Sequence, residues 1–276
     1  MTPVRAALAF ESTAHIMARN TQNQERCSHC GVTLATVLRM TGLRARVRAE
    51  LKAEILAAAH RQLAEVGAQE LSLRGIAREL GMANSAIYRY FSSRDELLTA
   101  LIIGAYDSLG IAGEEADRAV PPGSTEIERW TAIGRGAYAW ARAHPAEFAL
   151  IFGTPVPGYH APPDTVGAAT RFTAVLMGVL EDIARKHPLP SSPPPLSVPG
   201  RRDLEDLHAR IGGAAAPEWL ALGLHAWTGL IGTITFLMFG HLHNVVVDED
   251  AFFEMNLTLF GAAVFRASRP EAEVLR

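Results

Sequence analysis

The chain has 276 residues, of which 49% are hydrophobic, and its formal net charge is −3. This length and hydrophobic content allow one large domain or two modest ones with a real core, which excludes a chain that is disordered throughout. Two cysteines cannot form a disulfide framework for a protein of this size, so a reducing cytoplasm is expected.

Charge is distributed unevenly along the chain. Residues 44–98 carry nine Lys and Arg against seven acidic residues, whereas residues 99–276 carry 13 against 20. A basic front and an acidic remainder indicate that any polyanionic partner is bound by the first third of the chain.

The first stretch, residues 1–43, lacks the basic-then-apolar order of a signal peptide. Met40 stands just before the first recognisable helix. We interpret this stretch as a disordered N-terminal extension. An alternative is that translation starts at Met40 and the cell never makes residues 1–39.

The stretch contains Cys27 and Cys30 in "CSHC", which is half of a zinc site. A structural zinc needs four ligands, and only His15 and His29 are near, at the wrong spacing. We therefore favour a chance or redox-sensitive pair and expect no metal.

Three helices and the start of a fourth are predicted next. An amphipathic helix is expected from about Arg46 to Val66, where apolar residues recur every three or four positions. Ser72 can cap a second, short helix, which Gly81 ends because a left-handed residue stops a helix. A third short helix is expected over about 83–90, and the capping box "SRDE" at 93–96 opens the fourth.

Two short helices that meet at a glycine, between two longer ones, have the layout of a helix-turn-helix unit over residues 44–98. In such a unit the second short helix enters the major groove, so its outer face must be small or polar. Candidates for base contact are Arg74, Asn84, Ser85 and Ala86; those for holding phosphates are Tyr88, Tyr90 and Arg94, with Arg89 adding positive charge. Alternatively, Tyr88 and Tyr90 are ordinary half-buried aromatic residues. Arg78 is expected to be solvated or ion-paired and not to contact DNA.

Residues 99–276 are predicted to form a larger helical domain, because the chain contains no convincing strand pair. Helices are expected, in order, over about 125–144, 145–152, 165–185, 218–242 and 249–267. The Pro- and Gly-rich stretches 153–164 and 187–200 are expected to be a loop and an exposed linker that contains no helix. The expected fold class is all-α.

Aromatic residues of this larger domain are candidates for a ligand pocket. They are Trp140, Phe148, Phe152, Trp227 and Phe236. Large apolar side chains with few polar groups line ligand pockets, but core packing explains most such residues equally well.

The stretch from Trp219 to Val247 contains no Asp, Glu, Lys or Arg. Residues 219–239 are therefore long and apolar enough to cross a bilayer. Because no flanking Lys or Arg cluster sets a topology, we favour a helix buried in protein and expect no membrane partner.

The sequence "LSLRGIARELGMANSAIYRYFSSRDELLTAL" resembles the DNA-binding segment of TetR/AcrR-type transcriptional regulators. Gly81 stands in the turn, Tyr88 and Phe91 form the xYxxF signature, and the resemblance covers about residues 44–105. A looser resemblance, of "HPAEFALIFGTPVPGY" and "HAWTGLIGTITFLMFGHL" to the WHG type of ligand-binding domain, spans the remainder. It departs from the family at Thr228, where the family usually has His.

The resemblance implies roles for individual residues. Phosphate contacts would come from Ser72, Tyr88, Tyr90 and Arg94, and base-edge contacts from Arg74, Ser85 and Ala86. Ala83 stands where the family often has a Ser or Thr cap, so one phosphate contact would be missing. The resemblance also implies a homodimer built from the last two long helices, which binds double-stranded DNA at an inverted-repeat operator.

We predict a cytoplasmic, ligand-responsive transcriptional regulator, most simply a repressor that a small apolar effector releases from its operator, without a cofactor. No nucleophile elbow, phosphate loop, HExxH or paired Cys clusters occur, so an enzyme is not expected. Two alternatives stay open: a helical ligand-binding protein that does not bind DNA, and a protein associated with a membrane through residues 219–239.

Overall fold

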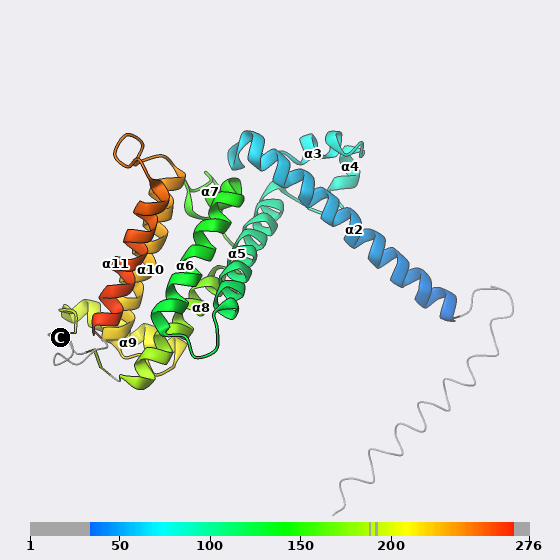
Figure 1. Cartoon of the computed structure of the whole chain (residues 1–276). Coiled ribbons are helices and arrows are strands. Elements are labelled where there is room, and N and C mark those ends of the chain that lie inside the picture. The colour runs from blue at the N-terminus through cyan, green and yellow to red at the C-terminus, as the bar shows by residue number, and fades with distance from the viewer. Residues whose placement is uncertain (1–33, 188, 191–192, 268–276) are drawn as a thin grey trace, which may run out of the picture. The chain divides into compact units, whose positions relative to one another are not determined.

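The computed structural model describes residues 34–187, 189–190 and 193–267, and every regular element in this part of the chain is a helix (Figure 1). The prediction of an all-α fold is confirmed. Contacts divide the chain into two units between Glu54 and Ile55. Cys27 and Cys30, like most of the predicted extension, lie outside the described residues.

Helix α2 spans Leu34–Val66 and crosses this division. It begins well before the predicted start near Arg46, because residues 34–45 contain no proline and a single glycine, so nothing in the sequence stops a helix there. In the first unit, Arg46 Nε donates to Glu50 Oε1 at 2.9 Å, a pair one turn apart on the helix surface.

The second unit begins with the predicted helix-turn-helix segment. Its elements are the end of α2, the short 3-10 helix η1 (Ala68–Glu70), α3 (Leu73–Glu79), α4 (Asn84–Ile87) and the start of α5 (Arg94–Ala119). Fully buried side chains at its centre include Ile76, Ile87, Phe91, Leu97 and Leu98. The predicted succession of helices is present, although α4 ends at Ile87, earlier than expected.

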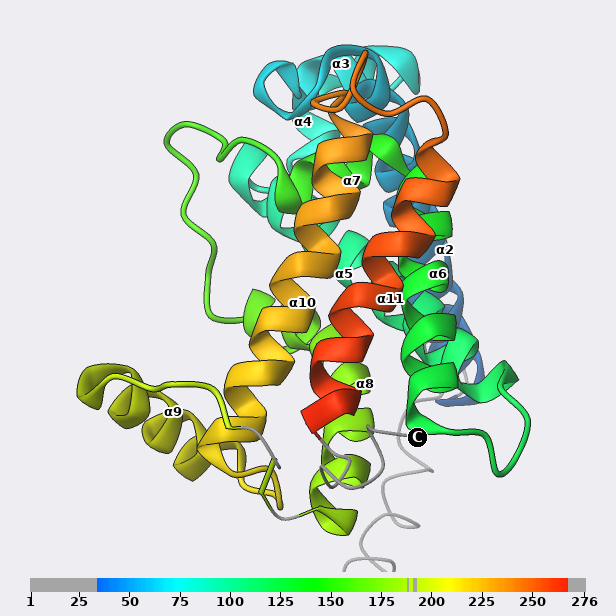
Figure 2. The ribbon, with the colours of Figure 1, turned by 60° about the vertical axis from the view of Figure 1, so that its left-hand side comes forward.

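The rest of this unit is a bundle in which α5 packs on both α6 and α8, and α10 and α11 lie side by side (Figure 2). Its further helices are α6 (Glu126–Ala143), α7 (Pro145–Phe152), α8 (Thr165–Lys186), α9 (Val198–Ile211), α10 (Pro217–Met238) and α11 (Glu249–Ala267). Trp219, Phe148, Ile133 and Phe253 are almost completely buried in its core. Helix α5 continues through the predicted domain boundary at residue 98, so one helix belongs to both segments.

Helix α9 corrects the prediction that the stretch 187–200 contains no helix. Pro199 lies in its first turn, where the missing N–H is not needed, and the Ser197 hydroxyl accepts a hydrogen bond from Gly200 N at 3.2 Å. The helix can therefore begin inside the Pro-rich stretch. It contains no buried residue and packs on α10.

An arginine ties three helices of the bundle together. Arg129 of α6 donates to Asp117 Oδ1 of α5 at 2.7 Å and to Asp182 Oδ2 of α8 at 2.5 Å. Burial alone would raise the pKa of Asp182, but the hydrogen bonds and charges of Arg129 and Arg185 hold it below its ordinary value. The carboxylate is thus favoured in its charged form.

Two helices, α5 and α10, could cross a membrane by length and composition alone. Both pack within the bundle: α5 on α6, α7 and α8, and α10 on α6, α8, α9 and α11. Such packing favours helices of a protein bundle, although Phe236 of α10 is 52% exposed.

Candidate nucleic-acid interface and ligand cavity

The start of α3 is fixed by Ser72. This residue is extended, its hydroxyl accepts a hydrogen bond from Gly75 N at 3.4 Å, and its own N–H donates to Gln62 Oε1 at 2.6 Å. The predicted N-cap is therefore present. Because the hydroxyl oxygen accepts the bond from Gly75, its own O–H can still donate to a phosphate.

The turn between α3 and α4 depends on Gly81. Its φ is +65°, in the left-handed region that glycine adopts without steric cost. Met82 N then donates to Ala77 O at 2.8 Å, which closes the end of α3. The chain is thereby turned so that α4 begins two residues later.

Helix α4 presents small and polar side chains outward. Ile87 and Phe91 are fully buried, whereas Asn84, Ser85 and Arg89 are exposed and Ala86 is half-buried. Ala83 precedes the helix without a side-chain cap bond, as the absence of a hydroxyl there implies.

The two tyrosines lie just beyond α4 and differ in environment. Tyr88 is 45% exposed, while Tyr90 is half-buried and packs on the hydrophobic cluster of this segment. Tyr90 thus lies just past the helix, as expected for a phosphate contact, but it is also half-buried, as expected for an ordinary packing residue.

The Arg94 side chain bonds to the protein's own backbone, a role that the sequence did not suggest. Its Nε donates to Leu71 O at 3.1 Å, and its Nη2 donates to Ala68 O at 2.7 Å and to Gln69 O at 3.0 Å. The side chain is partly buried by these bonds and holds η1 against the start of α5. Three of its five N–H groups are therefore used inside the protein.

The charge at this surface is positive. Arg74 and Arg78 of α3 are exposed, and the acidic residue of that helix, Glu79, is bound by Arg61 of α2 at 2.6 Å. Because Arg61 neutralises Glu79, little negative charge offsets the positive charge of the exposed arginines of α3.

The five aromatic residues predicted to line a pocket do not meet in one place. Trp140 is 5% exposed and donates Nε1–H to Ser108 Oγ at 2.9 Å, and Phe148 is 1% exposed, so both are core residues. Phe152 lines a separate recess with Phe239 and His241, and Phe236 is 52% exposed. Trp227 lines the apolar cavity of the bundle.

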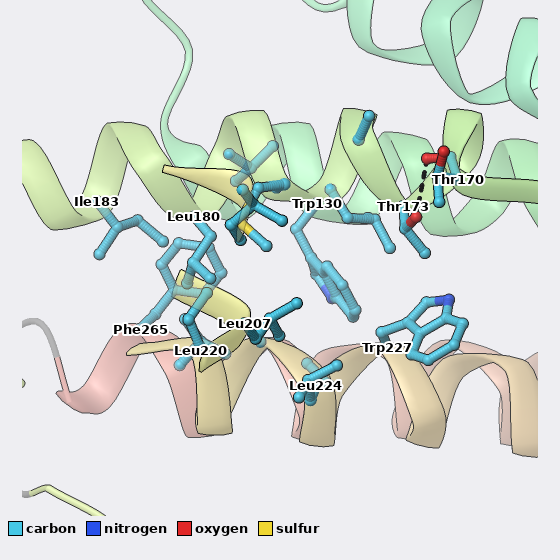
Figure 3. Close-up of a pocket in the computed structure, with 18 residues that line it drawn as sticks. Trp130, Thr170, Thr173, Leu180, Ile183, Leu207, Leu220, Leu224, Trp227 and Phe265 are labelled. Atoms are coloured by element: carbon cyan, nitrogen blue, oxygen red, sulfur yellow. Dashed lines mark hydrogen bonds between the residues drawn. The ribbon is translucent and has the colours of Figure 1, made fainter. Parts of the chain in front are cut away.

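That cavity has a volume of about 410 Å³ and lies among α6, α8, α9, α10 and α11 (Figure 3). Its lining residues are Trp130, Thr170, Thr173, Ala174, Leu176, Met177, Val179, Leu180, Ile183, Leu207, Ile211, Leu220, Gly223, Leu224, Ala226, Trp227, Val264 and Phe265. A concave, mostly apolar space of this size is typical of small-molecule sites.

Most of these lining residues could not be recognised as a pocket from the sequence. Leu176, Leu180 and Ile183 recur at helical spacing on α8, which is equally the pattern of a packed core stripe. The α9 residues Leu207 and Ile211 were missed because that helix was not predicted. Only the assembled bundle distinguishes a lined cavity from a filled core.

Metal binding finds no support in the described part of the chain. No group of three or more His, Cys, Asp or Glu there could hold an ion.

Comparison with known proteins gives two family matches. Residues 55–101 match the family model described as "Bacterial regulatory proteins, tetR family", and residues 130–260 match "Tetracyclin repressor-like, C-terminal domain". The first match contains α3 and α4, and the second contains most of the cavity lining.

Similar curated proteins include the HTH-type transcriptional regulators Mb1846 of Mycobacterium bovis and Rv1816 of Mycobacterium tuberculosis. Each is 37% identical to this chain over 235 residues, which are 81% of this chain and 96% of the relative. The solved structure of the regulatory protein SCO4313 matches with a TM-score of 0.64 and 30% identity, covering 78% of this chain and 97% of its own. A Rhodococcus sp. RHA1 protein of unknown function shares the fold, with a TM-score of 0.57 and 21% identity over 88% of this chain and 98% of its own.

Proposed function

Because this chain belongs to the TetR family of bacterial regulatory proteins, and is therefore a DNA-binding transcriptional regulator and not an enzyme, we propose that it is a ligand-responsive repressor. In this proposal it acts in the cytoplasm, and a small apolar effector releases it from an inverted-repeat operator. The observation that carries the proposal is that one chain combines a short helix with small and polar exposed side chains, α4, and an apolar cavity.

The proposed DNA contacts follow from exposure and chemistry. Arg74, Asn84, Ser85 and Ala86 are assigned to base edges, since they are small or can donate to bases in the major groove. Tyr88, Arg89 and Tyr90 are assigned to phosphates, which fix the register of the helix on the duplex. Ser72 is also assigned to a phosphate, since its O–H can donate while its oxygen caps α3, and Arg94 is assigned a supporting role, because its guanidinium holds η1.

A homodimer is proposed through α10 and α11. Phe236, Met255 and Leu259 are each at least 50% exposed on these helices, and such apolar groups gain free energy when a second copy covers them. A two-fold dimer carries two recognition helices, so the operator half-sites are expected about one helical turn apart.

Effector action is proposed as a population shift. A molecule bound in the cavity favours a conformation in which the two recognition helices are wrongly spaced for adjacent grooves. The effector shifts the equilibrium only by its difference in affinity between the two conformations.

The proposed DNA contacts are tested with the DNA that flanks the protein's own gene, by fluorescence anisotropy over a series of salt concentrations. Tyr88→Phe removes one phosphate hydrogen bond and is expected to weaken binding about fivefold without changing the salt slope. Arg74→Ala removes a cation at the interface and is expected to weaken binding about tenfold or more.

Arg78→Ala is the matched control, because it removes the same charge from the same exposed helix outside the proposed contacts. Its effect should stay within about twofold. Equal effects of the Arg74 and Arg78 variants would reject the assigned contact. A wild-type chain that raises the anisotropy of no flanking fragment would support the alternative of a ligand-binding protein that does not bind DNA.

A further inference from the structure

The apolar cavity is chemically uniform, and this restricts what it can bind. None of its described lining residues carries a charged side chain, and Thr170 and Thr173 supply its only hydroxyl groups. A carboxylate or ammonium against this lining would find no charged partner, and it would reach water only at the threonine end, where Thr170 is exposed. A charged ligand group is therefore disfavoured inside the cavity.

Most hydrogen-bond donors of the lining are already used. Trp130 Nε1–H donates to Leu257 O at 3.0 Å, Thr170 Oγ1 donates to Val166 O at 3.0 Å, and Thr173 Oγ1 donates to Thr170 O at 2.8 Å. Each hydroxyl oxygen still has lone pairs that can accept a hydrogen bond. The threonines therefore suit a ligand group that donates, such as an alcohol.

The polar and apolar parts of the cavity are separated along α8. Figure 3 shows Thr170 and Thr173 at the end beside Trp227, and Ile183 and Phe265 at the opposite end. Ile183 lies thirteen positions after Thr170 on the helix, which corresponds to a length of about 20 Å. Such a site matches an elongated molecule with one polar end.

Helix α9 forms part of the wall. It contributes Leu207 and Ile211, and Ile211 is 48% exposed although it lines the cavity. A hydrocarbon chain lying against these side chains would bury apolar surface that the protein alone leaves in contact with water.

We propose that the cavity binds an uncharged, elongated aliphatic molecule whose terminal hydroxyl donates to Thr173 or Thr170. This inference rests on the proposed function, because it names the chemical class of the effector. It distinguishes alcohols from the carboxylic acids of the same chain length, since only the alcohol is neutral at pH 7.

The test compares n-decanol with decanoate on the full chain at pH 7. Binding is followed by intrinsic tryptophan fluorescence, because Trp130 and Trp227 line the cavity, and by calorimetry. Decanol is expected to bind saturably and at least tenfold more tightly than decanoate. Equal or tighter binding of decanoate, or no saturable binding of decanol, would overturn the proposal.

Three variants locate the bound molecule. Leu224→Trp fills the cavity from a position that is 38% exposed, so the fold is expected to tolerate it, and it should abolish decanol binding. Thr173→Val keeps the shape and removes the acceptor, and it should weaken decanol binding about fivefold. Thr228→Val is the matched control, because its hydroxyl makes the same kind of intrahelical bond, to Leu224 O at 2.8 Å, outside the cavity lining.

Binding and DNA release are measured separately. If decanol binds as expected but does not release the operator fragment, the ligand class stands and the effector role in the proposed function fails. If the Leu224→Trp variant binds decanol like the wild type, the cavity is not the site and the inference fails, whatever happens on DNA.

Discussion

The guanidinium of Arg94 is bound to the protein's own backbone, at three carbonyl oxygens of the segment 68–71. A cation shared among carbonyls satisfies acceptors at the end of η1 and joins them to the first turn of α5. The side chain thereby determines where the helix-turn-helix segment meets the bundle helix, and this role differs from the phosphate contact that the sequence suggested.

Arg94→Ala is therefore expected to lower the free energy of unfolding by about 2 kcal/mol, because it removes charged hydrogen bonds and leaves carbonyls unpaired. Urea unfolding followed by circular dichroism measures this change. Arg74→Ala, an exposed arginine nearby, serves as the comparison and should stay within about 0.5 kcal/mol. If the Arg94→Ala protein were as stable as the wild type, and its DNA affinity depended less steeply on salt, Arg94 would be a phosphate contact and not a structural residue.

At this scale, the predictions that succeeded were local ones. Ser72 as a cap and Gly81 as a left-handed turn residue depend on neighbours within a few positions, so the sequence suffices to identify them. The partners of Arg94, like Ser108 opposite Trp140, lie more than 20 positions away and are brought near only by the fold.

Three helices of the bundle converge on Arg129, and the stability of their junction is expected to depend on pH. Asp182 has a lowered pKa, so the folded state favours its charged form and the unfolded state binds the proton more readily. The stability that it contributes is present above the unfolded pKa. It is lost as pH falls below about 4 and passes through the folded value.

Arg129→Met is expected to destabilise the protein by about 1–2 kcal/mol at pH 7, less than for a fully buried pair because these groups are partly exposed. The difference from wild type should shrink at low pH, where Asp182 is protonated in both proteins. Urea unfolding at neutral and at acidic pH measures it.

Arg185→Met provides the control for this junction. It removes an exposed arginine that pairs with the same Asp182 one turn away, and its effect should be close to zero. If both variants destabilised equally, the three-helix connection would have no special role.

Among the elements, the long amphipathic helices could be predicted because their apolar residues recur with helical spacing. Helix α9 could not, since three prolines in 194–199 suggested a linker and its first turn tolerates Pro199. The cavity also escaped prediction. Whether Leu180 and Leu220 touch or leave space between them depends on how α8 and α10 are separated, which periodicity does not encode.

For the whole molecule, the exposed face of α10 and α11 predicts the oligomeric state. Introducing Asp at both Phe236 and Leu259 would bury two charges in the proposed interface, at a cost that dimerisation does not recover. The double variant is expected to be monomeric by light scattering and to lose most of its operator affinity, because one half-site remains.

Val247→Asp is the matched control, since Val247 is also an exposed apolar residue but lies between α10 and α11 in the connecting loop. This variant should remain dimeric and bind DNA normally. A double variant that stays dimeric would place the subunit interface elsewhere on the chain.

Helix α5 runs unbroken from Arg94 to Ala119, with Leu97 and Leu101 in the core of the DNA-binding segment and Leu109 in that of the bundle. Its 26 residues make a rod of about 39 Å. By simple trigonometry on that length, a tilt of about 5° at one end displaces the other by roughly 3 Å. In the proposed ligand response, such a lever would turn a slight repacking around α8 into a shift comparable to the rise of one base pair.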